Sequence, residues 1–297
     1  MTPALPGIIS YRVNPESTAA AEPVVHIRAD RGNWDFHNLV RAPIQELVQF
    51  KELIRNTVVR DIKVRYKRSV LGIAWTIIAP LMQMIVMWTV FTKAFQVSMP
   101  NYALYLFSGI ITWNLFSQSS VAGGASILGA AGLITKIKLP RVLFPLTAVI
   151  NNLVNFSFAF AALLLLMVVT RAPFHWTMLS VPFMLLPLIL FCMGWAMLVS
   201  ALSVFFRDLQ YILEIALGAL FYATPIFWDP TALPAKWHWV ASVNPLAKYV
   251  FMMKASIYHG VLPNFSTYAI ATFTGLAMFV IGWIVFQRLQ RKFIYWI

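Results

Sequence analysis

The sequence has 297 residues, of which 60% belong to the hydrophobic AVILMFWYC set and only 11% are charged. Soluble globular domains average about 25% charged residues. This composition, with a mean hydropathy of +0.74, therefore excludes an ordinary soluble protein and predicts an integral membrane protein. The formal net charge of +13 does not indicate nucleic acid binding, because most basic residues flank apolar runs. That placement is typical of membrane topology and of attraction to anionic lipid headgroups.

Residues 1–42 are predicted to form a cytosolic N-terminal tail. They contain prolines, acids and bases but no continuous apolar core of the kind that a cleavable signal peptide needs. No motif in this tail indicates a particular chemistry. We therefore place the first domain boundary at residue 43.

The next segment, 43–68, is predicted to be an amphipathic helix in the cytosolic membrane interface. Its apolar residues recur every three or four positions, at Ile44, Leu47, Phe50, Ile54 and Val58, while polar residues occupy the opposite face. The segment ends in a cluster of basic residues, Arg60, Lys63, Arg65, Lys67 and Arg68, directly before the first long apolar run. We assign residues 69–297 to a transmembrane domain.

An apolar run of about 20 residues is long enough to cross the hydrocarbon core as a helix. We predict about six spans, at 70–92, 103–123, 145–169, 178–205, 209–227 and 267–287. Basic residues concentrate in the connections on the N-terminal side, so the positive-inside rule places both termini in the cytosol. The predicted fold class is an all-α polytopic membrane protein.

Two connections differ from ordinary loops. The inner one, 123–145, is rich in small residues, and we expect a short cytosolic helix at about 125–134. The outer one, 228–265, contains a helix start at Asn244 and Pro245 and a stop at Gly260. That outer helix is too short to span, so we expect an interfacial or re-entrant gate helix.

Residues suited to catalysis are sparse. After residue 61 the acidic residues are Asp208, Glu214 and Asp229, which form no evident pair, and the histidines lack metal-binding spacing. No glycine is followed by lysine, which excludes the GxxxxGK[ST] phosphate loop. The single Cys192 excludes an intramolecular disulfide. We therefore predict no catalytic residue, no metal site and no cofactor in this chain.

Four ordered motifs carry a resemblance to a known family. They are RDIKVRYKRSVLGIAWTIIAPL from Arg60, AGLITKIKLPRVLFPL from Ala131, FFRDLQYILEIAL from Phe205, and TPIFW followed by NPL from Thr224. From about Pro43 to its end, the sequence resembles ABC-2-type export permeases, nearest to the group that exports polysaccharides and polyol phosphates. The tail before Pro43 lies outside the best matches.

The resemblance implies a half-transporter in the bacterial inner membrane, with two copies of the permease and two separate ATP-binding cassette subunits that hold ATP and Mg. It implies a lipid-linked polysaccharide as substrate, similar to O-antigen on undecaprenyl pyrophosphate. Capsule or teichoic acid export, ABC-2 drug efflux and a membrane glycosyltransferase remain as alternatives.

The same resemblance assigns three groups of residues. A group that would couple to the ATPase comprises Lys136, Lys138, Pro140, Arg141, Arg207 and Asp208. A lipid-pyrophosphate entrance would comprise Arg60, Lys63, Arg65, Tyr66, Lys67 and Trp75. A glycan path would be lined by Tyr102, Tyr105, Trp113, Phe116, Tyr222 and Phe227. The alternatives are a topology-setting loop, attraction to anionic lipids, and interfacial or lipid-facing aromatic packing, respectively. For Arg207 and Asp208 the alternative is a solvated helix cap.

Overall fold

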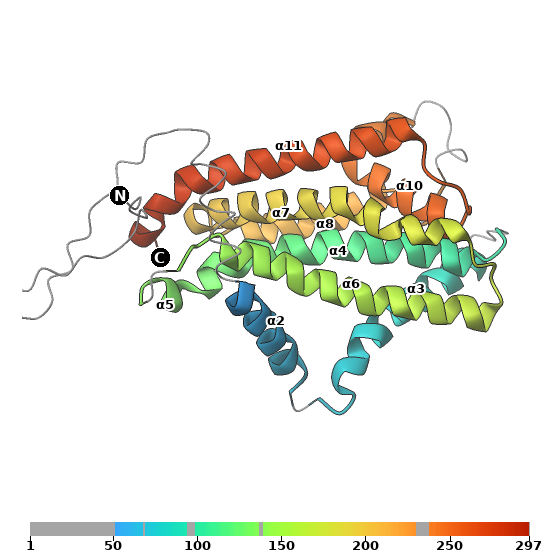
Figure 1. Ribbon diagram of the computed structural model, residues 1–297, viewed down its shortest axis with the longest axis horizontal. Coiled ribbons are helices and arrows are strands. Elements are labelled where there is room, and N and C mark those ends of the chain that lie inside the picture. Colours follow the sequence, from blue (N-terminus) through green and yellow to red (C-terminus); the bar gives the residue numbers. More distant parts are fainter. Residues whose placement is uncertain (1–50, 68, 94–98, 137–138, 230–237, 297) are drawn as a thin grey trace, which may run out of the picture. The chain divides into compact units, whose positions relative to one another are not determined.

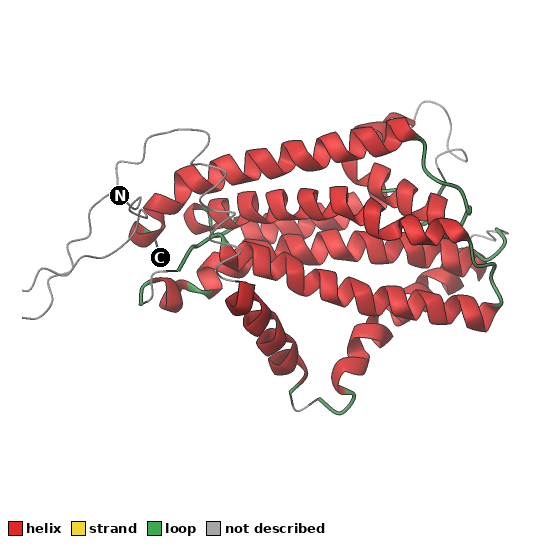
Figure 2. Cartoon of the chain, in the orientation of Figure 1, coloured by secondary structure: helices red, strands yellow, loops and turns green. Residues whose placement is uncertain are grey.

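A computed structural model describes residues 51–296 of the chain, apart from 68, 94–98, 137–138 and 230–237. Over these residues the secondary structure is entirely helical (Figure 2), which confirms the all-α prediction. The predicted tail 1–42 and the first part of the predicted amphipathic helix lie outside the described residues. The rest of that helix is α2, Lys51–Tyr66.

Five long helices form the body of the bundle (Figure 1): α3 Trp75–Lys93, α4 Tyr102–Gly129, α6 Leu143–Thr170, α7 Val181–Phe205 and α11 Phe265–Leu289. Two helices of intermediate length, α8 Leu209–Ala223 and α10 Pro245–Ile257, pack among them. The short helices are η1 Gly72–Ala74, α5 Ala131–Ile134, η2 Trp176–Ser180, α9 His238–Val243 and η5 Gln290–Tyr295.

Four helical segments are long and apolar enough to cross a membrane: Trp75–Lys93, Leu143–Thr170, Trp176–Phe205 and Phe265–Tyr295. The other two predicted spans, 103–123 and 209–227, correspond to α4 and α8. Helix α4 has 28 residues, but polar and small residues interrupt its apolar sequence. Helix α8 has 15 residues, fewer than the roughly 20 that a perpendicular crossing requires. The chain is thus a multi-pass membrane protein, while the count of six spans is not confirmed.

The core forms where small residues let helices approach closely. Helix α4 packs along both α6 and α7, and most of its residues are buried. Helix α7 packs along α11, where a Cβ atom added at Gly282 would collide with the backbone oxygen of Gly194. Close packing of this kind replaces the hydrophobic driving force, which is weak between helices surrounded by lipid.

Most connections lie at two opposite ends of the bundle, while the turn between α2 and α3 lies at neither end (Figure 1). One end holds α5, the turn between α7 and α8, and the C-terminus. The other end holds the start of α4, the end of α8 and the end of α10. The inner connection, the turn between α7 and α8 and the C-terminus, all predicted to be cytosolic, therefore lie at the same end of the bundle.

The structure revises the two special connections. The helix expected at about 125–134 is divided, because α4 continues to Gly129 and the one-turn helix α5 begins at Ala131. The outer helix is α10, whose Asn244 cap accepts a hydrogen bond from the Leu246 amide at 2.9 Å. Most of α10 is buried against α4, α7 and α11, so it is not a helix lying on the membrane surface.

Candidate functional site

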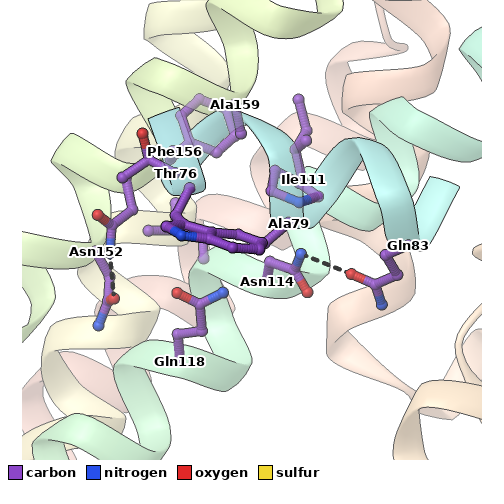
Figure 3. A pocket seen from close by; sticks show the side chains of 13 residues that line it. Thr76, Ala79, Gln83, Ile111, Asn114, Gln118, Asn152, Phe156 and Ala159 are labelled. Carbon is purple, nitrogen blue, oxygen red and sulfur yellow. Dashed lines mark hydrogen bonds between the residues drawn. The ribbon is translucent and has the colours of Figure 1, made fainter. Parts of the chain in front are cut away.

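A polar cavity of about 210 Å³ lies between α3, α4 and α6 (Figure 3). Five amide side chains line it, namely Gln83 from α3, Asn114 and Gln118 from α4, and Asn152 and Asn155 from α6. We call this cavity the amide pocket. Polar side chains are rare and usually functional in helices that cross a membrane, which makes their convergence here the most informative feature of the bundle.

Hydrogen bonds hold part of this lining in place. The Asn114 amide donates to the Gln83 carbonyl oxygen at 3.1 Å, which joins α4 to α3. The Asn155 amide donates to the side-chain oxygen of Asn152 at 3.1 Å, and Asn152 donates to the backbone oxygen of Ala148 at 3.0 Å. The fold therefore orients these amides instead of leaving them free to rotate.

The remaining walls of the amide pocket are aromatic and aliphatic. They come from residues such as Trp75, Pro80, Ile111, Leu115 and Phe156, and no charged side chain is among the described lining residues. Trp75 is 46% exposed, so the pocket is open on that side. Such a site can accept an uncharged ligand with both hydrogen-bond donors and acceptors.

The predicted entrance residues are divided between two places. Arg60 and Lys63 of α2 and Lys67 directly after it line a shared hollow of about 500 Å³, which we call the basic hollow. Trp75 lies in the amide pocket instead. The side chains of Arg65 and Tyr66 lie outside the described residues, so their assigned role stays a prediction.

A partly exposed contact joins α2 to the bundle. Asp61 accepts hydrogen bonds from Arg60 at 2.9 Å and from the Asn151 amide of α6 at 3.1 Å. Beside this contact lies a cleft of about 790 Å³ between α2, α5 and the ends of α4 and α6. The contact therefore joins α2 to α6 beside this cleft.

The predicted glycan-path aromatics lie mostly in the core of the single chain. Trp113 and Phe116 are buried and contact each other edge to face. The hydroxyls of Tyr102 and Tyr105 donate to the backbone oxygens of Phe227 and Trp228, at 2.6 and 2.9 Å. These side chains support the outer segment, whose Phe227 ring packs on Phe91 at 4.8 Å between centroids.

Tyr222, the remaining residue of the predicted glycan path, is 65% exposed. Contact of any residue of this path with a glycan stays a prediction.

Lys254 is the central residue of the outer end. The structure buries it to 2% exposure on the packed face of α10. Its amine donates to the backbone oxygens of Pro225 and Ile226 at 2.7 and 2.8 Å and lies 3.4 Å from the centre of the Tyr105 ring. Burial lowers the pKa of Lys254 well below its usual value, and Asp229 opposes that shift. We call Lys254, Tyr102, Tyr105 and the backbone of 225–228 the outer clasp.

The residues predicted to couple to an ATPase lie at the opposite end. Lys136, Arg207 and Asp208 are exposed. Pro140 is half-buried, and Lys138 lies outside the described residues. Arg141 donates to the backbone oxygen of Gln290 and so ties the inner connection to the end of α11. Burial lowers the pKa of Arg141.

Sequence reasoning named Trp75 but missed the five amides. Their spacing was a usable signal, because Asn114 and Gln118 are four residues apart and Asn152 and Asn155 three apart within apolar runs. Within the described part of the chain, His, Cys, Asp and Glu form no group of three that could hold a metal ion.

Comparison with known proteins adds independent information. Residues 52–258 match the family described as ABC-2 type transporter. The O-antigen export system permease protein RfbA of Klebsiella pneumoniae is 30% identical over 236 residues, which covers 79% of this chain and 90% of that protein. The protein of the same name from Myxococcus xanthus is 29% identical over 223 residues, covering 74% and 86%. The polysialic acid transport protein KpsM of Escherichia coli is 22% identical over 229 residues, covering 74% and 87%.

Proposed function

Because the chain belongs to the ABC-2 type transporter family, we propose that it is the permease subunit of an ATP-driven exporter of lipid-linked polysaccharide. In this proposal it acts in the bacterial inner membrane, with both termini in the cytosol, as a pair of identical copies bound to two ATP-binding cassette subunits. ATP and Mg belong to those subunits, and the substrate is a glycan on undecaprenyl pyrophosphate.

One observation carries the proposal: the family match extends over 52–258, and two relatives similar along most of their length are named for O-antigen export. KpsM, named for polysialic acid transport, keeps capsule export as the second candidate. The sequence contains no GxxxxGK[ST] loop, which supports an energy source on a separate protein.

The packing of the bundle supports a pair of copies. Buried side chains fill the centre of the chain, and the cavities described above, of about 210 to 790 Å³, are too small for a polymer. A polymer path therefore lies between two copies in this proposal. Helix α3 offers exposed apolar residues such as Met82, Ile85 and Val86, and α8 offers Tyr211 and Ile215, as surfaces for such contact or for lipid.

The inner end supports coupling to the ATPase. Lys136, Arg207 and Asp208 are exposed there, and Arg141 links their connection to the backbone of Gln290. A second hydrophobic cluster, with Ile127, Leu146, Met197 and Phe286 among its members, joins the ends of α4, α6, α7 and α11 behind them. A force on α5 would therefore reach four long helices. The alternative is that these charges only fix topology.

The function is tested with the purified permease and its proposed ATP-binding cassette partner, reconstituted in lipid nanodiscs. We expect undecaprenyl-pyrophosphate-linked glycan to stimulate ATP hydrolysis more strongly than lipophilic drugs do. Stronger stimulation by drugs would assign the chain to drug efflux. Transfer of sugar by the chain alone, with no ATPase present, would replace export with a membrane glycosyltransferase.

Coupling is tested with Lys136→Gln combined with Arg207→Gln. Loss of ATPase association and of glycan export is the expected result, because both exposed charges are removed from the surface proposed to bind the ATPase. The matched control is Arg171→Gln at the opposite end of the bundle. Arg141 is left intact because its internal hydrogen bond would confound the measurement. Full export and assembly in the double variant would show that the charges set topology only.

A further inference from the structure

The amide pocket contains hydrogen-bonding groups that the fold does not use. Within the described residues, no hydrogen bond engages the Gln118 amide, although Gln118 faces the cavity beside Asn114 (Figure 3). In the Asn114–Gln83 pair, each side chain uses one end of its amide, which leaves the Asn114 oxygen and the Gln83 nitrogen available. The Gln118 side chain is exposed and those of Asn114 and Gln83 are half-buried, so these unused amide ends are accessible to an entering polar molecule.

The chemistry of the lining selects one class of ligand. An amide oxygen accepts and an amide nitrogen donates, so a ring of amides matches hydroxyl groups, which do both. Trp75 and Phe156 provide flat apolar walls suited to the C–H face of a sugar ring. The absence of a charged side chain from the described lining disfavours a carboxylate or phosphate, whose burial without a partner is costly.

The volume limits the ligand to a single unit. The cavity has a volume of about 210 Å³. That space holds one sugar ring and not a length of polymer. The exposed side at Trp75 would let the rest of the glycan remain outside the pocket.

The three hollows at this side of the molecule adjoin one another. Arg60 lines both the basic hollow and the cleft beside α2, and Asn152 lines both that cleft and the amide pocket. Along this series the lining changes from basic to uncharged. A phosphate-linked glycan thus meets complementary chemistry at each end, with phosphate at the basic hollow and sugar at the amides.

We propose that the amide pocket binds one uncharged sugar unit of the exported glycan, through hydrogen bonds to Gln118, Asn114 and Gln83 and ring contacts with Trp75 and Phe156. This inference rests on the export function proposed above. It selects neutral glycans over acidic ones such as polysialic acid. This selectivity comes from the uncharged lining of the pocket and not from the basic surface of α2.

The test is saturation-transfer NMR with the purified full chain in nanodiscs and no ATPase. The probes are methyl glycosides of glucose, galactose, mannose and rhamnose, compared with methyl glucuronide and a methyl sialoside. At least one neutral glycoside should bind, and the acidic ones should not. Gln118→Met should weaken that binding about fivefold, the equivalent of one lost hydrogen bond.

The matched control is Gln287→Met, the same replacement on α11 outside the pocket, which should bind like the wild type. Should Gln118→Met fail to fold, Gln118→Ala provides the same comparison. Absence of neutral glycoside binding, equal binding of acidic glycosides, or unchanged binding in the pocket variant would each overturn the proposal. Because no ATPase is present, this binding measurement is independent of the ATP hydrolysis assay. Absence of glycan-stimulated ATP hydrolysis would overturn the export function itself.

Discussion

The outer clasp and the amide pocket are both polar clusters inside an apolar bundle, but they differ in how completely their hydrogen bonds are made. In the outer clasp, the amine of Lys254 and the hydroxyls of Tyr102 and Tyr105 each reach a backbone oxygen. In the amide pocket, Gln118 and one end of Asn114 face a cavity instead. A satisfied cluster stabilises the fold, whereas an unsatisfied one is available to a ligand. Substitutions in the outer clasp should therefore lower the stability of the fold, whereas substitutions in the amide pocket should weaken ligand binding.

The largest expected effect is on Lys254. Replacing it by Met keeps most of the apolar stem but leaves the Pro225 and Ile226 oxygens buried without a donor. We expect a loss of about 3 kcal/mol in the free energy of unfolding. Thermal unfolding in detergent measures it, with Lys248→Met on the same helix as the control. An unfolding temperature like that of the wild type would show that the outer clasp does not stabilise the fold.

A smaller loss is expected from Tyr105→Phe. This change removes only the hydroxyl that donates to the Trp228 oxygen at 2.9 Å, and the ring remains beside Lys254. The expected loss is about 1 kcal/mol, the typical contribution of one hydrogen bond. The exposed Tyr222→Phe is the matched control in the same unfolding measurement. Equal behaviour of the two variants would contradict the assignment of Tyr105 to the clasp.

Asp61→Ala should lower the free energy of unfolding by an amount between those expected for substitutions in the outer clasp and in the amide pocket. It removes the acceptor shared by Arg60 and Asn151, but the Asp61 side chain is 36% exposed, so solvent screens much of the interaction. We expect a loss of about 0.5 kcal/mol in unfolding free energy. Glu52→Ala, which removes an exposed pair with Arg55 on the same helix, should cause no measurable change. A similar result for both would mean that α2 is held by other contacts.

The smallest stability effect is expected for Gln118→Met, within about 0.5 kcal/mol of the wild type. The reason is that no hydrogen bond within the described residues depends on this amide. The same sample should nevertheless bind neutral glycoside more weakly by NMR. Marked destabilisation would move Gln118 from the ligand-binding group to the structural one and remove the contrast between the two regions.

Much of this architecture could be predicted because it follows from local patterns. The spacing of Asn244, Pro245 and Gly260 predicted α10 from its first residue, since a cap, a helix-compatible proline and a stop act within a few residues. The basic face of Arg60, Lys63 and Lys67 also follows from helical periodicity alone. What failed was the inner helix, because the sequence gives no sign that α4 continues to Gly129 before the chain turns.

The amino-acid sequence by itself determined that the chain is helical, enters the membrane and resembles ABC-2-type permeases, because composition, periodicity and ordered motifs are properties of neighbouring residues. Only the tertiary structure decided that Lys254 is buried and that amides from α3, α4 and α6 meet in one cavity. The physical reason is that satisfaction of a polar group depends on atoms far away in the chain. Helix packing decides whether a lysine or a glutamine stabilises the fold or is available to bind a ligand. The residue type alone does not determine this.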